Sequence, residues 1–162
     1  MSRRALGLGL LVALATATAV HGATVPAPQT SAGKLRVIIS ERGTFTPQPP
    51  HGTFVLGGPA GRDSGTTSLT PAPAGPERFR DGQRYVRESA SDILRGKKGN
   101  LVIALNGTSV NAAENLYVEY GTWHIIGSAG TGAYAGWRGG GRWAASDDER
   151  HYSLRFEGLV TR

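Results

Sequence analysis

The feature of this 162-residue sequence that most limits its fold is the absence of helical periodicity. In no window do apolar residues recur at three- and four-residue spacing over three helical turns. Short segments rich in β-branched residues are instead separated by glycine and proline, which is typical of strands joined by turns. The sequence therefore predicts an all-β fold with at most a single helical turn, which we place near residues 88–94.

Eight strands follow from this pattern, with proline-rich loops expected at residues 43–52 and 71–82 and a tight turn at Asn106-Gly107. The expected strands cover residues 35–41, 53–56, 65–70, 83–89, 100–106, 117–126, 133–143 and 152–161. A two-sheet sandwich and a closed barrel are the common arrangements for such a chain. Closure removes exposed strand edges, and glycines within strands permit the bending that closure needs. We therefore favour an antiparallel up-and-down eight-stranded β-barrel.

The N-terminal residues predict a signal peptide. Arg3 and Arg4 precede an uncharged segment, residues 5–20, which is too short and too weakly apolar for a typical membrane span. The two arginines also fit a twin-arginine export signal, although they equally supply the basic start of an ordinary secretory signal, which we favour. We expect a signal peptide at residues 1–23, a flexible linker at residues 24–33, one barrel domain at residues 34–162 and a secreted protein.

The composition argues against a metal site. The sequence contains no Cys, and its four His residues do not have a metal-ligand spacing. We expect His124 and His151 to face solvent. The adjacent carboxylates Asp147, Asp148 and Glu149 are expected to form a solvated turn rather than a calcium site.

Nucleic acid and nucleotide cofactors are not expected as ligands. The formal net charge is +6, but the basic residues are scattered and are not interleaved with an aromatic platform. Gly130-Thr131-Gly132 superficially resembles a phosphate-binding loop, yet no helix pattern follows it to supply an N-terminus. We therefore expect no cofactor.

Glycine is concentrated in residues 121–141, GTWHIIGSAGTGAYAGWRGGG. We expect Gly130 and Gly132 to form a hairpin that requires positive φ angles. In the strand that follows, Tyr134 and Arg138 would share one face and Trp137 would lie on the other. This alternation predicts that at least one large aromatic side chain is exposed.

The same segment resembles the strand–turn–strand signature of the allene oxide cyclase-like and dirigent-like β-barrels, and it looks closest to small secreted bacterial members. Asp63-Ser64-Gly65-Thr66 and residues 154–158 (LRFEG) fit the pattern more loosely. The resemblance covers residues 34–162, although only residues 121–141 are distinctive. It implies a barrel, either cyclisation of an unstable epoxide or guidance of phenoxy-radical coupling, and a possible homo-oligomer. It assigns no catalytic residue.

Candidate ligand-binding residues are Tyr117, Glu119, Trp123, Tyr134 and Arg138. We expect Tyr117, Glu119 and Trp123 to face the barrel interior. A carboxylate in an apolar barrel has a raised pKa and can act as an acid or base on a ligand. Alternatively, Glu119 lies solvated at the mouth or pairs with Arg138 or Arg155. Arg138 can bind a ligand carboxylate or serve a structural role.

Three kinds of function fit these expectations. The first is a secreted barrel that binds a small, largely apolar molecule in its interior or mouth. The second is a cofactor-independent cyclase or isomerase, or a guide of radical coupling, as the resemblance implies. The third is a non-catalytic structural or interaction protein outside the cell. An internal pocket with polar groups favours the first two, whereas a barrel filled by side chains favours the third.

Overall fold

The computed structural model describes residues 33–162, so the predicted signal peptide and nearly all of the predicted linker lie outside the described residues. The strands are β1 (Leu35–Thr44), β2 (His51–Gly57), β3 (Asp63–Pro71), β4 (Glu77–Arg80), β5 (Gln83–Gly96), β6 (Gly99–Ala113), β7 (Leu116–Ile125), β8 (Arg138–Asp147) and β9 (His151–Thr161). Two 3₁₀ segments, η1 (Gly127–Ala129) and η2 (Gly132–Tyr134), connect β7 to β8. Residues 33–162 include no helix long and apolar enough to cross a bilayer.

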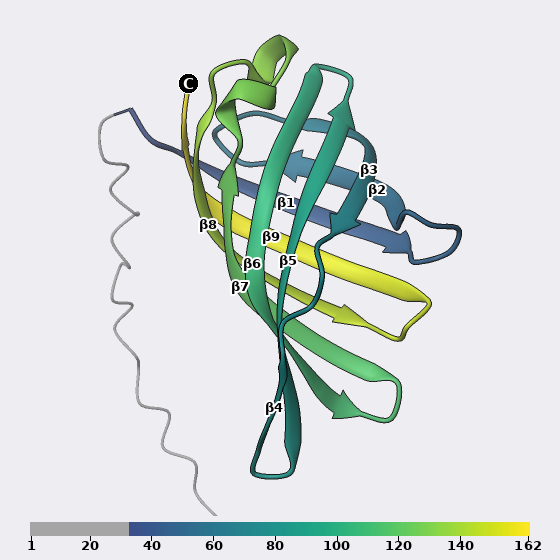
Figure 1. The fold of residues 1–162 in the computed structure, drawn as a ribbon. Helices are drawn as coiled ribbons and strands as arrows, with labels where there is room; N and C mark the ends of the chain where they lie inside the picture. Colours follow the sequence, from purple (N-terminus) through teal and green to yellow (C-terminus); the bar gives the residue numbers. More distant parts are fainter. Residues whose placement is uncertain (1–32) are drawn as a thin grey trace, which may run out of the picture.

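The strands form one antiparallel sheet that closes on itself (Figure 1). Neighbours in sequence pair from β1 to β3 and from β5 to β9, while β9 pairs with β1 and β3 pairs with β5. These contacts complete a ring of eight strands, to which β4 is attached through β5. The expected eight-stranded antiparallel barrel is confirmed, and its closure leaves few free strand edges.

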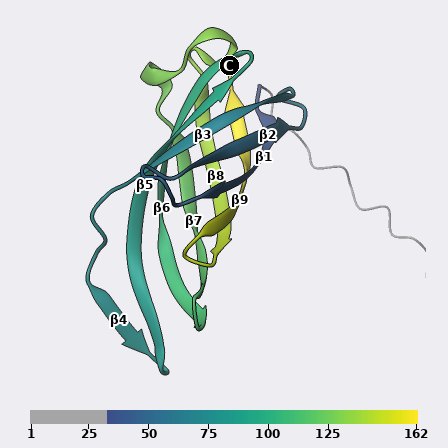
Figure 2. The ribbon, with the colours of Figure 1, turned by 90° about the vertical axis from the view of Figure 1, so that its right-hand side faces the viewer.

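The proline-rich segment at residues 71–82 contains a strand and is not only a loop. β3 ends with Pro71 opposite Ala90 of β5, and pairing resumes with Glu77 of β4 opposite Val86. Residues 72–76 thus face residues 87–89, so the prolines interrupt the pairing without ending it. The resulting β4–β5 hairpin extends beyond the barrel wall (Figure 2).

Two turns expected from the sequence are strand instead. Residues 88–94, the predicted helical turn, lie within β5. Asn106-Gly107 lies inside β6, where Gly107 is opposite Gly121 of β7. A Cβ atom at Gly107 would lie 2.4 Å from the Trp143 ring, so this glycine leaves room for an indole rather than forming a turn.

The glycine-rich connection between β7 and β8 is not the predicted hairpin. Gly132 has a φ angle of +58°, as expected, but Gly130 has a φ angle of −72°. The backbone N–H groups of Thr131 and Ala133 donate to carbonyl oxygens at the β5–β6 turn and fold the connection over the barrel end. Tyr134 and Trp137 therefore both point inward and are only 3% and 2% exposed. The prediction that at least one large aromatic side chain of this segment is exposed is wrong.

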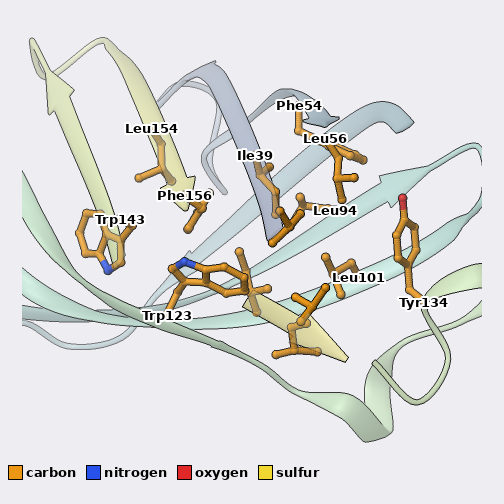
Figure 3. Close-up of a cluster of buried hydrophobic side chains, with 14 of the residues drawn as sticks. Ile39, Phe54, Leu56, Leu94, Leu101, Trp123, Tyr134, Trp143, Leu154 and Phe156 are labelled. Carbon is orange, nitrogen blue, oxygen red and sulfur yellow. The ribbon is translucent and has the colours of Figure 1, made fainter. Parts of the chain in front are cut away.

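The apolar core lies inside the barrel (Figure 3). Trp143 lies toward one side of this view and Tyr134 toward the other, with Trp123 and Phe156 between them. The rings of Trp123 and Phe156 pack edge to face, with centroids 5.9 Å apart. The indole N–H of Trp123 donates to the carbonyl of Arg142 at 3.1 Å, which satisfies its buried polar atom.

The two ends of the barrel are different. The loop between β7 and β8 and the C-terminus lie at the top of Figure 1, and this loop packs against the β5–β6 turn. Asp63 holds this closed end together, because its carboxylate accepts hydrogen bonds from the Tyr134 hydroxyl at 2.7 Å and from the backbone of the β5–β6 turn. The β6–β7 and β8–β9 turns lie at the opposite, lower right end of Figure 1.

Candidate functional site

A cavity of about 460 Å³ opens at the end of the barrel opposite the β7–β8 loop. Its wall is largely apolar and includes Phe45, Leu69, Ala90, Leu105, Trp143, Ala145, Tyr152 and Leu154. These side chains come from β3, β5, β6, β8 and β9 and from the connection between β1 and β2. A concave, mostly apolar site of this size is typical of small-molecule binding sites.

Carboxylates dominate the polar part of the cavity lining. Glu88 comes from β5, Glu119 from β7 and Asp147 from the end of β8, and Glu149 follows in the β8–β9 turn. The strand register brings them together, because Asp147 is opposite Tyr117, two residues before Glu119 on the same face of β7. The site is therefore assembled from segments that are far apart in the sequence.

Burial and neighbouring negative charge raise the pKa of Glu119 to about 8. Desolvation is the largest cause, followed by the charges of Glu88 and Asp147, whereas a hydrogen bond with Ser109 acts in the opposite direction. Burial also raises the pKa of Asp147, and the charge of Glu88 adds to this effect. The cavity consequently holds carboxyl groups that retain protons near neutral pH more readily than free carboxylates.

Apart from the carboxylates that line the cavity, a pair of carboxyl groups is fully buried inside the barrel. Glu41 of β1 and Asp92 of β5 are 1% and 0% exposed. The Thr67 hydroxyl lies 3.3 Å from Glu41 Oε2 and forms a short hydrogen bond with Asp92 Oδ1. Burial, followed by the charge of Asp92, raises the pKa of Glu41 to about 10, so this pair retains a proton at neutral pH.

Several buried polar atoms near this pair lack a hydrogen-bond partner among residues 33–162. They include the Tyr152 hydroxyl, Glu41 Oε1 and Asp92 Oδ2. Tyr152 lines the cavity, and its pKa is raised by burial and then by the charges of Glu41 and Asp92. An unpaired buried polar group is costly, and of these residues Tyr152 is the one that lies in the cavity wall.

The sequence-predicted candidates do not form one site. Tyr117 and Glu119 line the cavity, whereas Trp123 is buried in the core. Tyr134 lies at the closed end with Asp63, and Arg138 is exposed in a shallow outer groove. The separation arises because residues 127–137 form a loop and do not continue a strand beside β7.

Glu119 faces inward, as expected, and it lines the cavity as a half-buried side chain. The alternative ion pairs with Arg138 or Arg155 are not formed among the described residues. Arg155 instead binds Glu157 at 2.8 Å, and Arg138 points outward at the other end of β8.

Sequence reasoning missed Glu41, Glu88 and Asp92. Their positions carried a signal, because Glu41 continues the alternation of Val37 and Ile39 on the inward face of β1. Glu88 and Asp92 were missed because a helical turn was expected at residues 88–94. In the structure this segment is strand, and its two-residue alternation places both side chains on the inward face of β5.

The other sequence-based expectations about polar residues concern histidines and the acidic turn. His124 and His151 are exposed, as predicted. The expected solvated acidic turn is wrong for Asp147, which ends β8, is buried and lines the cavity because its side chain lies on the inward face of that strand. Asp148 lies in the β8–β9 turn, as expected, and accepts hydrogen bonds from the backbone N–H groups of Arg150 and His151 at 3.0 and 2.6 Å. Among residues 33–162, no group of three or more acidic or histidine side chains is arranged to hold a metal ion.

No family model, no curated protein and no solved structure matches the chain. The resemblance to allene oxide cyclase-like and dirigent-like barrels therefore remains a prediction. A function for this barrel has to rest on the cavity, with its apolar wall and its carboxylate-rich mouth.

Proposed function

We propose that the protein binds a small, largely apolar molecule in the cavity at the open end of its barrel. The observation that carries the proposal is the combination of an apolar wall, about 460 Å³ of space and a few convergent polar groups. Burial of apolar ligand surface against this wall provides the driving force, and the polar groups orient the ligand.

The distribution of small residues supports binding over a purely structural role. Ala90 and Ala145 both face the cavity. Larger side chains at these positions would occupy the open half of the barrel, as Leu101, Ile103 and other large residues occupy the core. A barrel with only a structural role gains stability from a filled interior and has no need of this space.

A neutral fluorescent probe tests the proposal. N-phenylnaphthylamine, whose nitrogen stays unprotonated near neutral pH, should bind saturably at one site per chain. Ala145→Phe, which fills the cavity, should abolish binding. Ala144→Phe is the matched control, because Ala144 is the preceding residue of β8 and faces solvent. Equal binding to both variants would contradict the proposal.

A second candidate function, a cofactor-independent cyclase or isomerase, uses the same cavity. It is supported by Glu119, which is placed in the cavity with a pKa raised to about 8 and can therefore donate a proton near neutral pH. The resemblance to allene oxide cyclase-like and dirigent-like barrels points in the same direction. Glu119→Gln should reduce turnover of an epoxide or phenolic substrate while N-phenylnaphthylamine still binds, and unchanged turnover excludes this role for Glu119.

A further inference from the structure

We infer that the ligand of this cavity is an amine, with a protonated nitrogen held by Glu88, Glu119 and Asp147 and an apolar body against the aromatic wall. This inference rests on the proposed function, because it specifies the chemical class of the small molecule bound there.

The charge of the cavity is opposite to that of the chain. The chain has 18 Lys and Arg residues against 12 Asp and Glu residues. Four carboxylates nevertheless line the cavity, and Arg84 is the one basic residue among the described residues that line it. Arg84 binds Glu77 at 2.5 Å, and Glu77 does not line the cavity. Arg84 is therefore paired with a carboxylate outside the site, while its charge also acts on Glu88.

The carboxylates in the cavity repel one another. Glu119 is affected by the charges of both Glu88 and Asp147, and Glu88 also acts on Asp147. Such a group can relieve the repulsion by taking up protons or by binding a cation. An ammonium group among these three side chains would compensate their charge and donate charge-assisted hydrogen bonds to their oxygens.

An independent observation points to a ligand with a polar group. Tyr152 lines the cavity and is only 6% exposed, and its hydroxyl has no hydrogen-bond partner among residues 33–162. A hydroxyl oxygen accepts hydrogen bonds from an ammonium group, which has donors and no acceptor.

Aromatic rings favour an organic amine over a bare metal ion. Phe45, Tyr117, Trp143 and Tyr152 all line the cavity. The rings of Phe45 and Tyr152 are 5.4 Å apart between centroids. Aromatic faces attract cations and also bury the apolar part of a ligand, whereas a hydrated metal ion makes no use of an apolar wall.

Three molecules of similar shape test this inference: phenylbutylamine, phenylbutanol and phenylbutanoate, each titrated by calorimetry near neutral pH. The amine should bind at least about tenfold more tightly than the alcohol, as expected for hydrogen bonds to charged groups. Phenylbutanoate should bind most weakly of the three. Added salt should reduce the preference for the amine.

Variants assign the effect to the cavity. Glu88→Gln and Glu119→Gln should each weaken amine binding about tenfold and leave alcohol binding unchanged. Glu114→Gln is the matched control, because it removes an exposed carboxylate from the β6–β7 turn at the same end of the barrel and should change neither affinity. Retained binding of N-phenylnaphthylamine shows that each variant is folded.

The outcomes separate this inference from the proposed function. Equal affinities for the amine and the alcohol would overturn the inference and leave the binding function intact. If Ca²⁺ displaces the amine and binds the cavity more tightly than the amine does, the inference is also overturned, because the carboxylates would then serve a metal ion. If none of the three phenylbutyl molecules binds the wild-type chain, and N-phenylnaphthylamine does not bind it either, both proposals fail.

Discussion

Glu119 should couple amine binding to proton release. Its pKa is raised to about 8, mainly by burial and then by Glu88 and Asp147, so it is largely protonated at neutral pH in the empty cavity. A bound cation favours the carboxylate and lowers this pKa, so binding releases a proton and tightens as the pH rises toward 8. Glu119→Gln should abolish the release. Calorimetry in buffers of different ionisation enthalpy measures it, and buffer-independent binding heats would contradict the prediction.

The other charged and titratable groups of the cavity bear on the same measurement. They are Arg84 and Glu88 on β5, Tyr117 on β7, Asp147 on β8, Glu149 in the β8–β9 turn and Tyr152 on β9. Glu149 accepts a hydrogen bond from Tyr117 at 3.2 Å, so it is less available to a ligand than Glu119. Glu149→Gln therefore serves as a variant within the cavity that should retain most of the proton release.

Glu41 should make the barrel less stable as the pH rises. Its pKa is raised from 4.5 to about 10 by burial and by Asp92, so the folded state binds a proton that the unfolded state has lost between these values. The stability contributed by this proton is complete below pH 4.5 and is lost as the pH rises toward 10. Glu41→Gln should flatten this dependence and raise the free energy of unfolding at neutral pH by on the order of 1–3 kcal/mol.

Urea unfolding of both chains across this pH range provides the measurement. Glu114→Gln, which alters an exposed carboxylate, should leave the pH dependence unchanged. A wild-type chain whose stability is constant or increases between neutral and alkaline pH would show that Glu41 is ionised in the folded state.

At the scale of secondary-structure elements, the alternation of apolar and polar residues predicted most strands but not their ends. It placed β1, β7 and β9 within a few residues. It failed where local signals and long-range pairing disagree. Asn106-Gly107 has the sequence of a tight turn, but in β6 its glycine faces the Trp143 ring. The local preference for a turn is overcome by packing inside the barrel.

We expect Asp63, which lies outside the loop that contains η1 and η2, to stabilise the folded position of this loop. Asp63 accepts hydrogen bonds from the Tyr134 hydroxyl and from the backbone of Ser64, Lys97 and Lys98. Burial opposes ionisation of Asp63, but these hydrogen bonds together lower its pKa. Asp63→Ala should therefore lower the free energy of unfolding by on the order of 2–3 kcal/mol, and Tyr134→Phe by about 1–2 kcal/mol.

Thermal or urea unfolding measures these losses, and the double variant should lose less than the sum of the two because the side chains share a hydrogen bond. Binding of N-phenylnaphthylamine should be retained by both single variants, since Asp63 and Tyr134 lie at the closed end. Strict additivity of the two losses would mean that the hydrogen bond contributes little.

For the whole molecule, closure of the barrel determines which residues meet, and this is why the sequence predicted only part of the candidate site. Tyr117 and Glu119 could be placed from one strand. Glu88 and Asp147 reach the same cavity from β5 and β8, and their common height depends on the register of every strand between them. Alternation shows which face a residue takes, but it does not show its height along the barrel axis.

The barrel should fold without the first 32 residues. The ring is closed by pairing of β1 (Leu35–Thr44) with β9 (His151–Thr161), and all of this pairing lies within residues 35–160. A chain that begins at Gly33 should therefore show the same unfolding transition and the same N-phenylnaphthylamine affinity as the longer chain. A chain that begins at Phe45 lacks β1, which exposes edges of β2 and β9, and it should aggregate or remain unfolded.

Circular dichroism, size-exclusion chromatography and probe titration distinguish these results. Failure of the chain that begins at Gly33 to fold would show that the preceding residues contribute to the barrel, and the domain boundary predicted at residue 34 would then be wrong.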